Sequence, residues 1–319
     1  MQRADEEAAR PSKDGVQRGG RLFVVGTPIG NFGDLSPRAV AAFEAADAVC
    51  CEDTRVTGKL LARAGVSRAL VRCDENVIAA RAPELVGRLL AGETLAYASD
   101  AGMPGVSDPG QVLVEAALGA GADVEVVPGP SACVTALVAS GIACEHFFFE
   151  GFLPRKEGER LRRLQRLAGV PGALIFYESP HRTLATVEAI AQVFPGRVAA
   201  LCRELTKLHE EMLRAPSPEL AALLRERGEL KGEVVLVVAP PSEEEWAAVE
   251  RAEAFAAAGA AAGPAASGAA SPQDELLRAD IRAALDAGEP VGAIAKRLSQ
   301  KYSLRKRAVY ELAVELQGR

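Results

Sequence analysis

The sequence is poor in the residues that build metal centres and disulfide frameworks. It has three histidines and six cysteines, at positions 50, 51, 73, 133, 144 and 202, and no two cysteines are spaced as C-x-x-C. Structural zinc sites need such close ligand pairs, so we expect no metal. Most of the cysteines stand among apolar residues, which is typical of buried free thiols in a reducing cytosol and predicts a cytoplasmic location.

Long apolar runs and a secretion signal are also missing. The longest apolar runs are far shorter than the ~18 residues of a membrane-spanning helix, so we expect no membrane partner. Residues 1–20, MQRADEEAARPSKDGVQRGG, have no apolar core and predict a disordered tail. The net charge of −6 argues against nucleic-acid binding over the whole surface, although a mean value can hide a local basic patch.

Two common nucleotide-binding fingerprints are absent. The first predicted strand is followed by GTPIGN, which does not match the G-x-G-x-x-G of dinucleotide sites. The phosphate-cradling pattern G-x-x-x-x-G-K-[ST] does not occur anywhere in the chain. These absences exclude the best-known ways in which an α/β protein grips a phosphate.

Short apolar segments that alternate with amphipathic helices are present instead. They predict an α/β domain with a mostly parallel sheet over 21–145 and a second α/β domain over 146–241, whose strands need not all be parallel. Residues 242–272 are rich in Ala and Gly and predict a flexible linker. Residues 273–319 predict a small helical domain that resembles a helix-turn-helix unit, with Ser303 as an N-cap.

Three loops of the first domain follow predicted strands. They read GTPIGN, SDAGMPGVSDPG and PGPSA. Ligands of open α/β sheets bind outside the carboxyl ends of strands, and glycine lets backbone approach a ligand closely. We therefore expect a small ligand that carries hydroxyls, an amine or a positive centre, although each loop taken alone reads equally well as a tight turn.

Seven motifs carry a family resemblance. In chain order they are VVGTPIGNFGDLSPRA, CEDTR, SDAGMPGVSDPG, VVPGPSA, FEGFLPRK, FYESPHR and LCRELTKLHEE. Together they resemble the S-adenosylmethionine-dependent ribosomal RNA 2′-O-methyltransferases of the tetrapyrrole methylase fold. The resemblance spans about 21–241, and SLRKRAVYELAVEL fits the small helical tail of that family. It implies two α/β domains with the cofactor between them, a homodimer, and a cytidine of 16S RNA in the small ribosomal subunit as the target.

The resemblance also implies which residues hold S-adenosylmethionine. Pro28 and Gly30 would line its methionine side. Its amino-acid and ribose groups would lie against the segment Ser99, Asp100, Ala101 and Gly102, which Ser107 closes. Its adenosine would lie beside Ser131, Ala132, Tyr177 and Ala239.

Methyl transfer to a ribose hydroxyl gains from a general base. The candidates, for this role or for orienting the substrate, are Glu52, Asp53, Glu178, His181, Lys207, Glu210 and Glu211. The sequence does not rank them. Lys207 qualifies if burial makes it neutral, whereas Asp53 and the two glutamates at 210–211 are equally compatible with ion pairs or solvated positions.

Basic residues predict an RNA-binding rim. The segment 153–166 carries six basic and two acidic side chains, and we expect phosphate contacts from Arg55, Lys59, Arg155, Lys156, Arg160 and Arg182. Phe147–Phe149 and Phe152 suit base stacking, but their strand pattern favours core packing. The cluster Arg305–Arg307 in the tail predicts either a further RNA contact or a solvated face.

Two other functions remain open at this point. A small-molecule methylase of the same fold, acting on a tetrapyrrole, would share the cofactor loops. A regulator that binds nucleic acid through its tail and senses a ligand through its sheet domain would share the composition. The motifs CEDTR and ESPHR and the basic segment favour the RNA methyltransferase.

Overall fold

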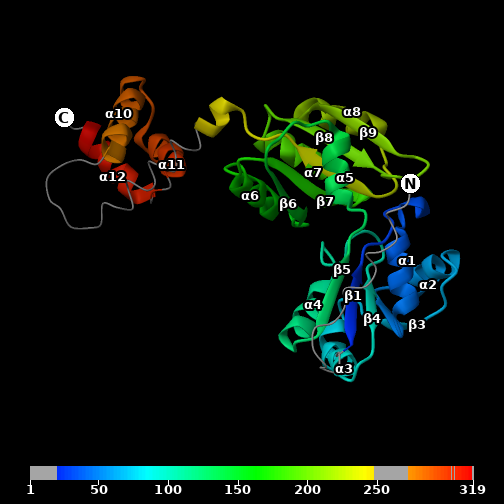
Figure 1. The fold of residues 1–319 in the computed structure, drawn as a ribbon. Coiled ribbons are helices and arrows are strands. Elements are labelled where there is room, and N and C mark those ends of the chain that lie inside the picture. The colour runs from blue at the N-terminus through cyan, green and yellow to red at the C-terminus, as the bar shows by residue number, and fades with distance from the viewer. Residues whose placement is uncertain (1–19, 248–271, 303, 305, 318–319) are drawn as a thin grey trace. The chain divides into compact units, whose positions relative to one another are not determined.

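The computed structural model describes residues 20–247, 272–302, 304 and 306–317 (Figure 1). The chain forms two compact units, Met1–Pro241 and Ser242–Arg319. The first unit contains both predicted α/β domains, and the second contains the helical tail. In the described ranges, no helix has the length and the apolar content to cross a bilayer.

The first sheet is entirely parallel. Its strands are β1 (Arg21–Val25), β2 (Ala48–Cys51), β3 (Ala69–Arg72), β4 (Leu95–Ala98) and β5 (Asp123–Val127), in the order β3-β2-β4-β1-β5. The predicted parallel sheet is thus confirmed. Every residue of β2 and β4 is buried, as expected of strands covered on both faces.

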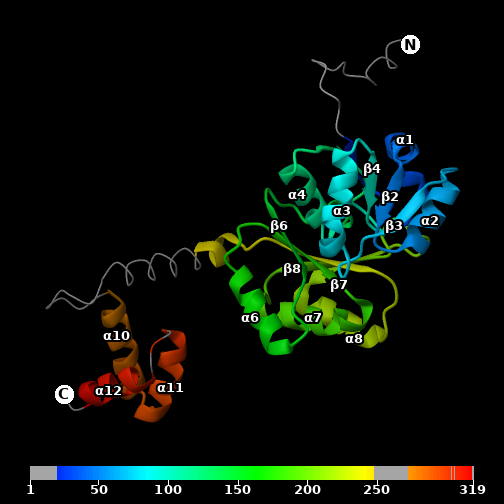
Figure 2. The same cartoon turned by 90° about the horizontal axis from the view of Figure 1, so that it is seen from below.

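Helices cover both faces of this sheet (Figures 1 and 2). The helices α1 (Pro37–Ala45) and α2 (Thr54–Arg63) pack on one face, and α3 (Ile78–Leu90) and α4 (Gly110–Gly119) pack on the other. A short 3-10 turn, η1 (Phe32–Asp34), precedes α1. Ser36 caps α1: its hydroxyl accepts a hydrogen bond from the N–H of Ala39, and Pro37 starts the helix.

The second sheet is mixed. It consists of β6 (Phe147–Phe152), β7 (Ala173–Glu178), β8 (Val198–Arg203), β9 (Glu211–Pro216) and β10 (Val234–Val238), in the order β6-β7-β10-β8-β9. The pair β6–β7 is parallel, and the other three pairs are antiparallel.

One face of the second sheet carries three helices of its own domain. These are α6 (Glu157–Leu167), α7 (Pro180–Val193) and α8 (Ser217–Arg227). The opposite face is covered by α5 (Ala132–Ser140), whose Cys133 and Ala136 pack against β7, β8 and β10. The chain therefore places a helix from before residue 145 on the second sheet, and the two sheets are joined through it.

Two strands escape prediction from the sequence. β3 is an edge strand without a fully buried residue, and β9 is an edge strand of the second sheet with the half-buried pattern MLR at its centre. Neither has the continuous apolar run that marks an interior strand. The helix α2 starts at Thr54, where the Asp53 carboxylate caps it.

The tail is a bundle of three helices, α10 (Pro272–Asp286), α11 (Val291–Lys301) and α12 (Lys306–Gln317). Its own apolar core includes Ile281, Ile294, Leu298 and Val309, which confirms the predicted helical domain. The proposed N-cap Ser303 and the basic residue Arg305 lie outside the described residues. So do 1–19 of the predicted tail and 248–271 of the predicted linker.

All six cysteines are free thiols, as predicted. Five are buried and Cys144 is half-buried. Cys50 and Cys73 belong to the core between the sheet and α3.

Candidate active site

The loops after β1, β4 and β5 meet at one edge of the first sheet, as predicted. These three strands are neighbours, so their carboxyl ends are adjacent. Thr27 and Gly102 exchange backbone hydrogen bonds of 2.9 and 3.2 Å, which tie the first loop to the second. The backbones of Gly26 and Gly129 lie so close that a Cβ on Gly26 would stand 2.6 Å from Gly129. Glycine is required for this approach.

A cavity of about 410 Å³ lies between these loops and the second sheet. Its walls come from six segments of the chain: Ile29, Ala101–Met103 with Val106, Ser131–Ala132, Phe152, Tyr177–Pro180 and Gly232–Val235, the last three from the second domain. The volume is in the range of small-molecule sites, and the walls are mainly apolar. The predicted cleft between the two α/β domains is therefore present.

The lining of this cavity contains no lysine or arginine. Of its two glutamates, Glu178 has a fully buried carboxylate, and Glu233 is exposed and paired with the Lys207 ammonium at 3.1 Å. The mainly apolar lining agrees with the absent phosphate-binding motifs. A ligand with apolar parts and a positive centre fits these walls.

Strained backbone gathers around the cavity. Among the described residues, the positive φ angles outside glycine belong to Ser107 (65°), Glu204 (52°) and Thr206 (64°). Ser107 lies in the loop after β4, and its Oγ is 3.1 Å from where a Cβ of Gly151 would stand. The Thr206 hydroxyl accepts a 3.1 Å hydrogen bond from the N–H of Asn31. Such conformations concentrate at functional sites.

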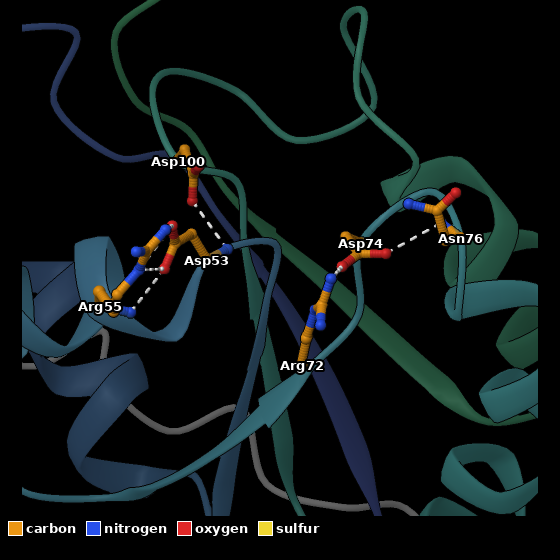
Figure 3. Close-up of polar contacts among 6 residues, drawn as sticks. All are labelled: Asp53, Arg55, Arg72, Asp74, Asn76 and Asp100. Atoms are coloured by element: carbon orange, nitrogen blue, oxygen red, sulfur yellow. Dashed lines mark hydrogen bonds and ion pairs between the residues drawn. The ribbon is translucent and has the colours of Figure 1, made fainter.

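A second hollow, of about 560 Å³, adjoins the loops after β2, β3 and β4 (Figure 3). Two arginine–aspartate pairs line it, Arg55 with Asp53 and Arg72 with Asp74, together with Glu52, Thr54, Glu75, Asn76 and Asp100. Its lining is polar where the first cavity is apolar. Asp100 and Ala101 are adjacent in the chain and line different hollows.

The carboxylates of the second hollow differ in pKa. Burial raises the pKa of Glu52 and of Asp100, and the backbone hydrogen bond that each accepts opposes this shift. Hydrogen bonds from Arg55 lower the pKa of Asp53. Glu52 and Asp100 are therefore the better proton acceptors of this group, because a base gains strength as its pKa rises.

The other predicted base candidates are engaged elsewhere. The Glu178 carboxylate is fully buried and accepts hydrogen bonds from the Ser179 N–H (2.8 Å) and the Thr186 hydroxyl (2.6 Å). Hydrogen bonds from Arg227 and Arg203 lower the pKa of Glu211. Glu210 is exposed and accepts a hydrogen bond from the Thr206 N–H. His181 is exposed, 4.0 Å from Glu229.

The surroundings of Lys207 do not favour the neutral form that a base at this position would need. Burial opposes its charge, but its ammonium lies 2.8 Å from Glu204 and 3.1 Å from Glu233, and these contacts together raise its pKa. Lys207 is thus held as a cation beside a carboxylate of the cavity wall. It is a positioning group rather than a base.

The structure distributes the predicted cofactor residues over three places. Ala101, Gly102, Ser131, Ala132 and Tyr177 line the apolar cavity. Asp100 belongs to the second hollow. The remaining five, Pro28, Gly30, Ser99, Ser107 and Ala239, belong to the flanking segments but are not part of the cavity lining.

Several wall residues were not predicted from the sequence. Ile29, Met103 and Val106 lie inside loops that were recognised, but their apolar side chains resemble core residues. Gly232–Val235 lead into β10, whose pairing in the second sheet brings them to the cavity. The sequence signal that could have identified them is Gly232, a glycine two residues before the apolar strand β10.

The predicted basic rim is only partly exposed. Arg55, Lys59, Arg155 and Lys156 are exposed. The expectation of a phosphate contact is wrong for Arg160, which is buried and donates to the Arg155 carbonyl at 3.3 Å. Arg182 is half-buried: it donates to the Leu153 carbonyl at 2.7 Å and lies 3.3 Å from Glu178.

The favoured assignment of the phenylalanines to the core is also wrong. Phe147, Phe148 and Phe152 are exposed, while Phe149 is half-buried against the core of the second sheet.

The two sheets, the helix that links them and the apolar cavity at the loop edge define a methylase fold. The family profile of the Tetrapyrrole (Corrin/Porphyrin) Methylases matches residues 21–221. The chain belongs to this family, and it is a methyltransferase.

Its relatives include proteins named Ribosomal RNA small subunit methyltransferase I. The one from Synechocystis sp. is 37% identical over 301 residues, which cover 94% of this chain and 99% of that protein. The one from Escherichia coli O157:H7 is 36% identical and covers 94% of this chain and 96% of its own. The one from Xylella fastidiosa is 44% identical over 221 residues, 69% of this chain and 81% of its own.

Solved structures share the fold. Diphthine synthase matches with a TM-score of 0.55 at 13% identity, over 73% of this chain and 94% of its own. Uroporphyrin-III C-methyl transferase from Thermus thermophilus, solved in complex with S-adenyl homocysteine, matches with a TM-score of 0.50 at 21% identity, over 69% of this chain and 97% of its own.

Proposed function

We propose that this methyltransferase transfers the methyl group of S-adenosylmethionine to the ribose 2′-hydroxyl of a cytidine in 16S ribosomal RNA. The observation that carries the proposal is the mainly apolar cavity at the meeting point of the family's motifs. The names of relatives that align with 94% of the chain support the ribosomal RNA acceptor. The choice of the cytidine 2′-hydroxyl rests on the resemblance of the seven motifs.

The residues of the apolar cavity fit this donor. When bound, S-adenosylmethionine supplies an electrophilic methyl group on a positively charged sulfur. The backbone of Ala101–Met103 and of Ser131–Ala132 can approach it closely, since Gly102 has a φ of +85° that other residues rarely adopt. Tyr177, Ala132 and Val235 offer apolar surface to a planar ring, and Glu233 offers a carboxylate to a positive group.

The second hollow suits the acceptor ribose. Asp100 is exposed, lines the second hollow and directly precedes the cavity residue Ala101 in the chain. We assign Asp100 as the general base. As the ribose oxygen bonds to the methyl carbon and the carbon–sulfur bond breaks, Asp100 takes the hydroxyl proton. Such proton transfer contributes about 10²- to 10⁴-fold, and placing oxygen and methyl in line contributes more.

A methylation assay tests the proposal. The protein is incubated with S-adenosylmethionine labelled in its methyl group and with small ribosomal subunits that lack the modification, and the labelled nucleotide is mapped. We expect one cytidine, labelled on its 2′-oxygen. Label on a base atom, or on a tetrapyrrole offered in parallel, would replace this proposal by another methylase activity of the same fold.

Removing the helical tail tests whether the protein is a methyltransferase or a ligand-sensing regulator that binds nucleic acid. Residues 1–241 form a compact unit of their own, so a chain that ends at Pro241 can be tested. If this unit still methylates RNA, the regulator is excluded. The homodimer and the cytoplasmic location implied by the resemblance and the cysteines stay predictions, which sedimentation and fractionation test.

A further inference from the structure

Strand β6 contains a bulge that changes the direction of one aromatic side chain. Phe149 of β6 pairs with Ile175 of β7, and the next pairs are Gly151 with Phe176 and Phe152 with Tyr177. Glu150 is therefore an extra residue in β6. Successive strand residues alternate between faces, so an inserted residue moves all that follow to the other face. Because of the bulge, Phe152 shares a face with Phe149 and Tyr177.

The ring contacts agree with this register. The ring of Tyr177 lies edge-on to Phe149, with centroids 4.8 Å apart, and edge-on to Phe152, with centroids 5.9 Å apart. Phe149 is half-buried, whereas Phe152 is 57% exposed and lines the apolar cavity. The bulge thus supplies the rim of the cavity with a flat ring that has only one side packed.

The glycine of the bulge ties it to the loop after β4. Gly151 has a φ of +75°, and a Cβ on it would stand 3.1 Å from the Oγ of Ser107, which itself has a φ of 65°. Bulges beside active sites commonly redirect a side chain. Glycine at this position therefore lets β6 run close to the loop after β4, next to Phe152 in the chain.

We propose that Phe152 stacks on the nucleobase of the acceptor nucleotide; this rests on the proposed function. A flat exposed ring accepts any planar base, and both the acceptor cytosine and the donor adenine have one. The acceptor is favoured because Phe152 lies on an edge strand and leads directly to the exposed cations Arg155 and Lys156. The cavity interior, with Tyr177 and Val235, offers the donor a more buried surface.

Three substitutions of Phe152 and one matched control test this. Phe152→Ala removes the ring, Phe152→Leu keeps apolar bulk without a flat face, and Phe152→Trp restores a ring. Phe147→Ala is the control, since Phe147 is 49% exposed on the same strand but does not line the cavity. The measurements are KM and kcat with small ribosomal subunits, and the Kd of S-adenosylhomocysteine by calorimetry.

We expect Phe152→Ala and Phe152→Leu to raise KM for the RNA by about 5- to 100-fold, the range of one stacked base. Phe152→Trp and Phe147→Ala should stay near the unmodified protein, with an unchanged Kd for S-adenosylhomocysteine in all four. A weakened Kd in Phe152→Ala would assign the ring to the donor adenine and overturn the proposal. So would an unchanged KM. If the unmodified protein transfers no methyl group to RNA, the proposed function itself fails.

Discussion

The backbone N–H of Asp100 donates a hydrogen bond to Oε1 of Glu52 over 3.1 Å. In the other direction, the N–H of Asp53 donates to Oδ1 of Asp100, also over 3.1 Å (Figure 3). These two bonds join the ends of the neighbouring strands β2 and β4. They fix the Asp100 carboxylate in the lining of the second hollow, one residue before Ala101 of the apolar cavity.

Asp100→Asn should therefore lower the rate of methyl transfer by about 10²- to 10⁴-fold, because the amide cannot accept the hydroxyl proton. The pKa of Asp100 is raised, so in the unmodified protein the rate should fall on acidification at a higher pH than an ordinary aspartate would give. Single-turnover rates from pH 4 to pH 8 measure both effects. An unchanged Kd for S-adenosylhomocysteine in Asp100→Asn would separate this role from the cofactor contact that the sequence implied.

Glu52→Gln should leave the stability unchanged or raise it, while it lowers the rate of methylation. The folded-state pKa of Glu52 is raised by burial, so ionisation of Glu52 is less favourable in the folded chain than in the unfolded chain. Its stabilising contribution is complete below the unfolded pKa and is lost as pH rises through the folded pKa. Above that pH we expect Glu52→Gln to unfold at the same temperature or higher, while the methylation rate falls. Thermal unfolding at pH 7 and pH 4 checks the sign, and a lower midpoint at pH 7 would contradict it.

Lys207→Arg distinguishes a positioning cation from a catalytic base. Arginine keeps the positive charge between Glu204 and Glu233 but cannot give up its proton in the working pH range. We expect this variant to retain activity within about tenfold, and Lys207→Met to lose more because the Glu204 and Glu233 carboxylates lose their shared cation. If both variants were equally inactive with unchanged donor binding, Lys207 would have to be reconsidered as the base.

Glu178 should matter for stability before catalysis. Its buried carboxylate accepts from Ser179 and Thr186 and faces Arg182, so Glu178→Ala removes the acceptor of the first two and the counter-charge of the third. We expect a loss of about 3 kcal/mol in the free energy of unfolding, measured in urea. Glu188→Ala is the control, because Glu188 makes a surface ion pair with Arg225. That variant should lose less than about 1 kcal/mol. Equal losses would show that burial adds nothing to the Glu178 contacts.

The sequence predicted the interior of both sheets better than their edges. Buried parallel strands such as β4 read as continuous apolar runs, and the capped start of α1 is visible in the residues Ser36 and Pro37. The edge strand β3 has only Leu70 and Val71 half-buried, one on each face, and this is too short a pattern to be distinguished from a loop. The position of α5 on the second sheet depends on long-range packing, which local patterns do not contain.

The loops of the site were predictable, but the direction of their side chains was not. Glycine and proline spacing located the segment 99–110, whereas the division of Asp100 and Ala101 between two hollows depends on the three-dimensional path of the loop. The bulge at Gly151 reverses the strand alternation, so an argument from periodicity assigned Phe152 to the core. Arg160 looked like its basic neighbours, and only the helix packing shows that it is buried.

Gly30→Ala should disturb the donor site without unfolding the chain. A Cβ at this position would collide with Lys207 Cγ and stand 2.9 Å from Thr206 Oγ1, so the loop that carries Lys207 has to shift. Because Lys207 is paired with the cavity residue Glu233, we expect the Kd of S-adenosylhomocysteine to rise about tenfold, an effect of about 1.4 kcal/mol. Gly87→Ala is the control: nothing lies near its Cβ within α3, so that variant should gain about 0.5–1 kcal/mol of stability. Unchanged donor binding in Gly30→Ala would disconnect Gly30 and Lys207 from the site.

Arg155 and Lys156 should contribute to RNA affinity through charge alone. Both are exposed at the start of α6, and the 3.4 Å contact of Lys156 with Glu159 is a weak surface pair. Replacing both by alanine should weaken binding of single-stranded RNA and reduce the slope of log affinity against log salt by about 0.7 for each phosphate that the protein no longer neutralises. Fluorescence titrations between about 50 and 200 mM salt measure this slope. Arg225→Ala, an exposed change on α8, is the control that should leave the slope unchanged. Arg160→Ala should instead lower the unfolding temperature, because its guanidinium is buried. A double variant with unaltered slope and affinity would place the RNA on another face of the protein.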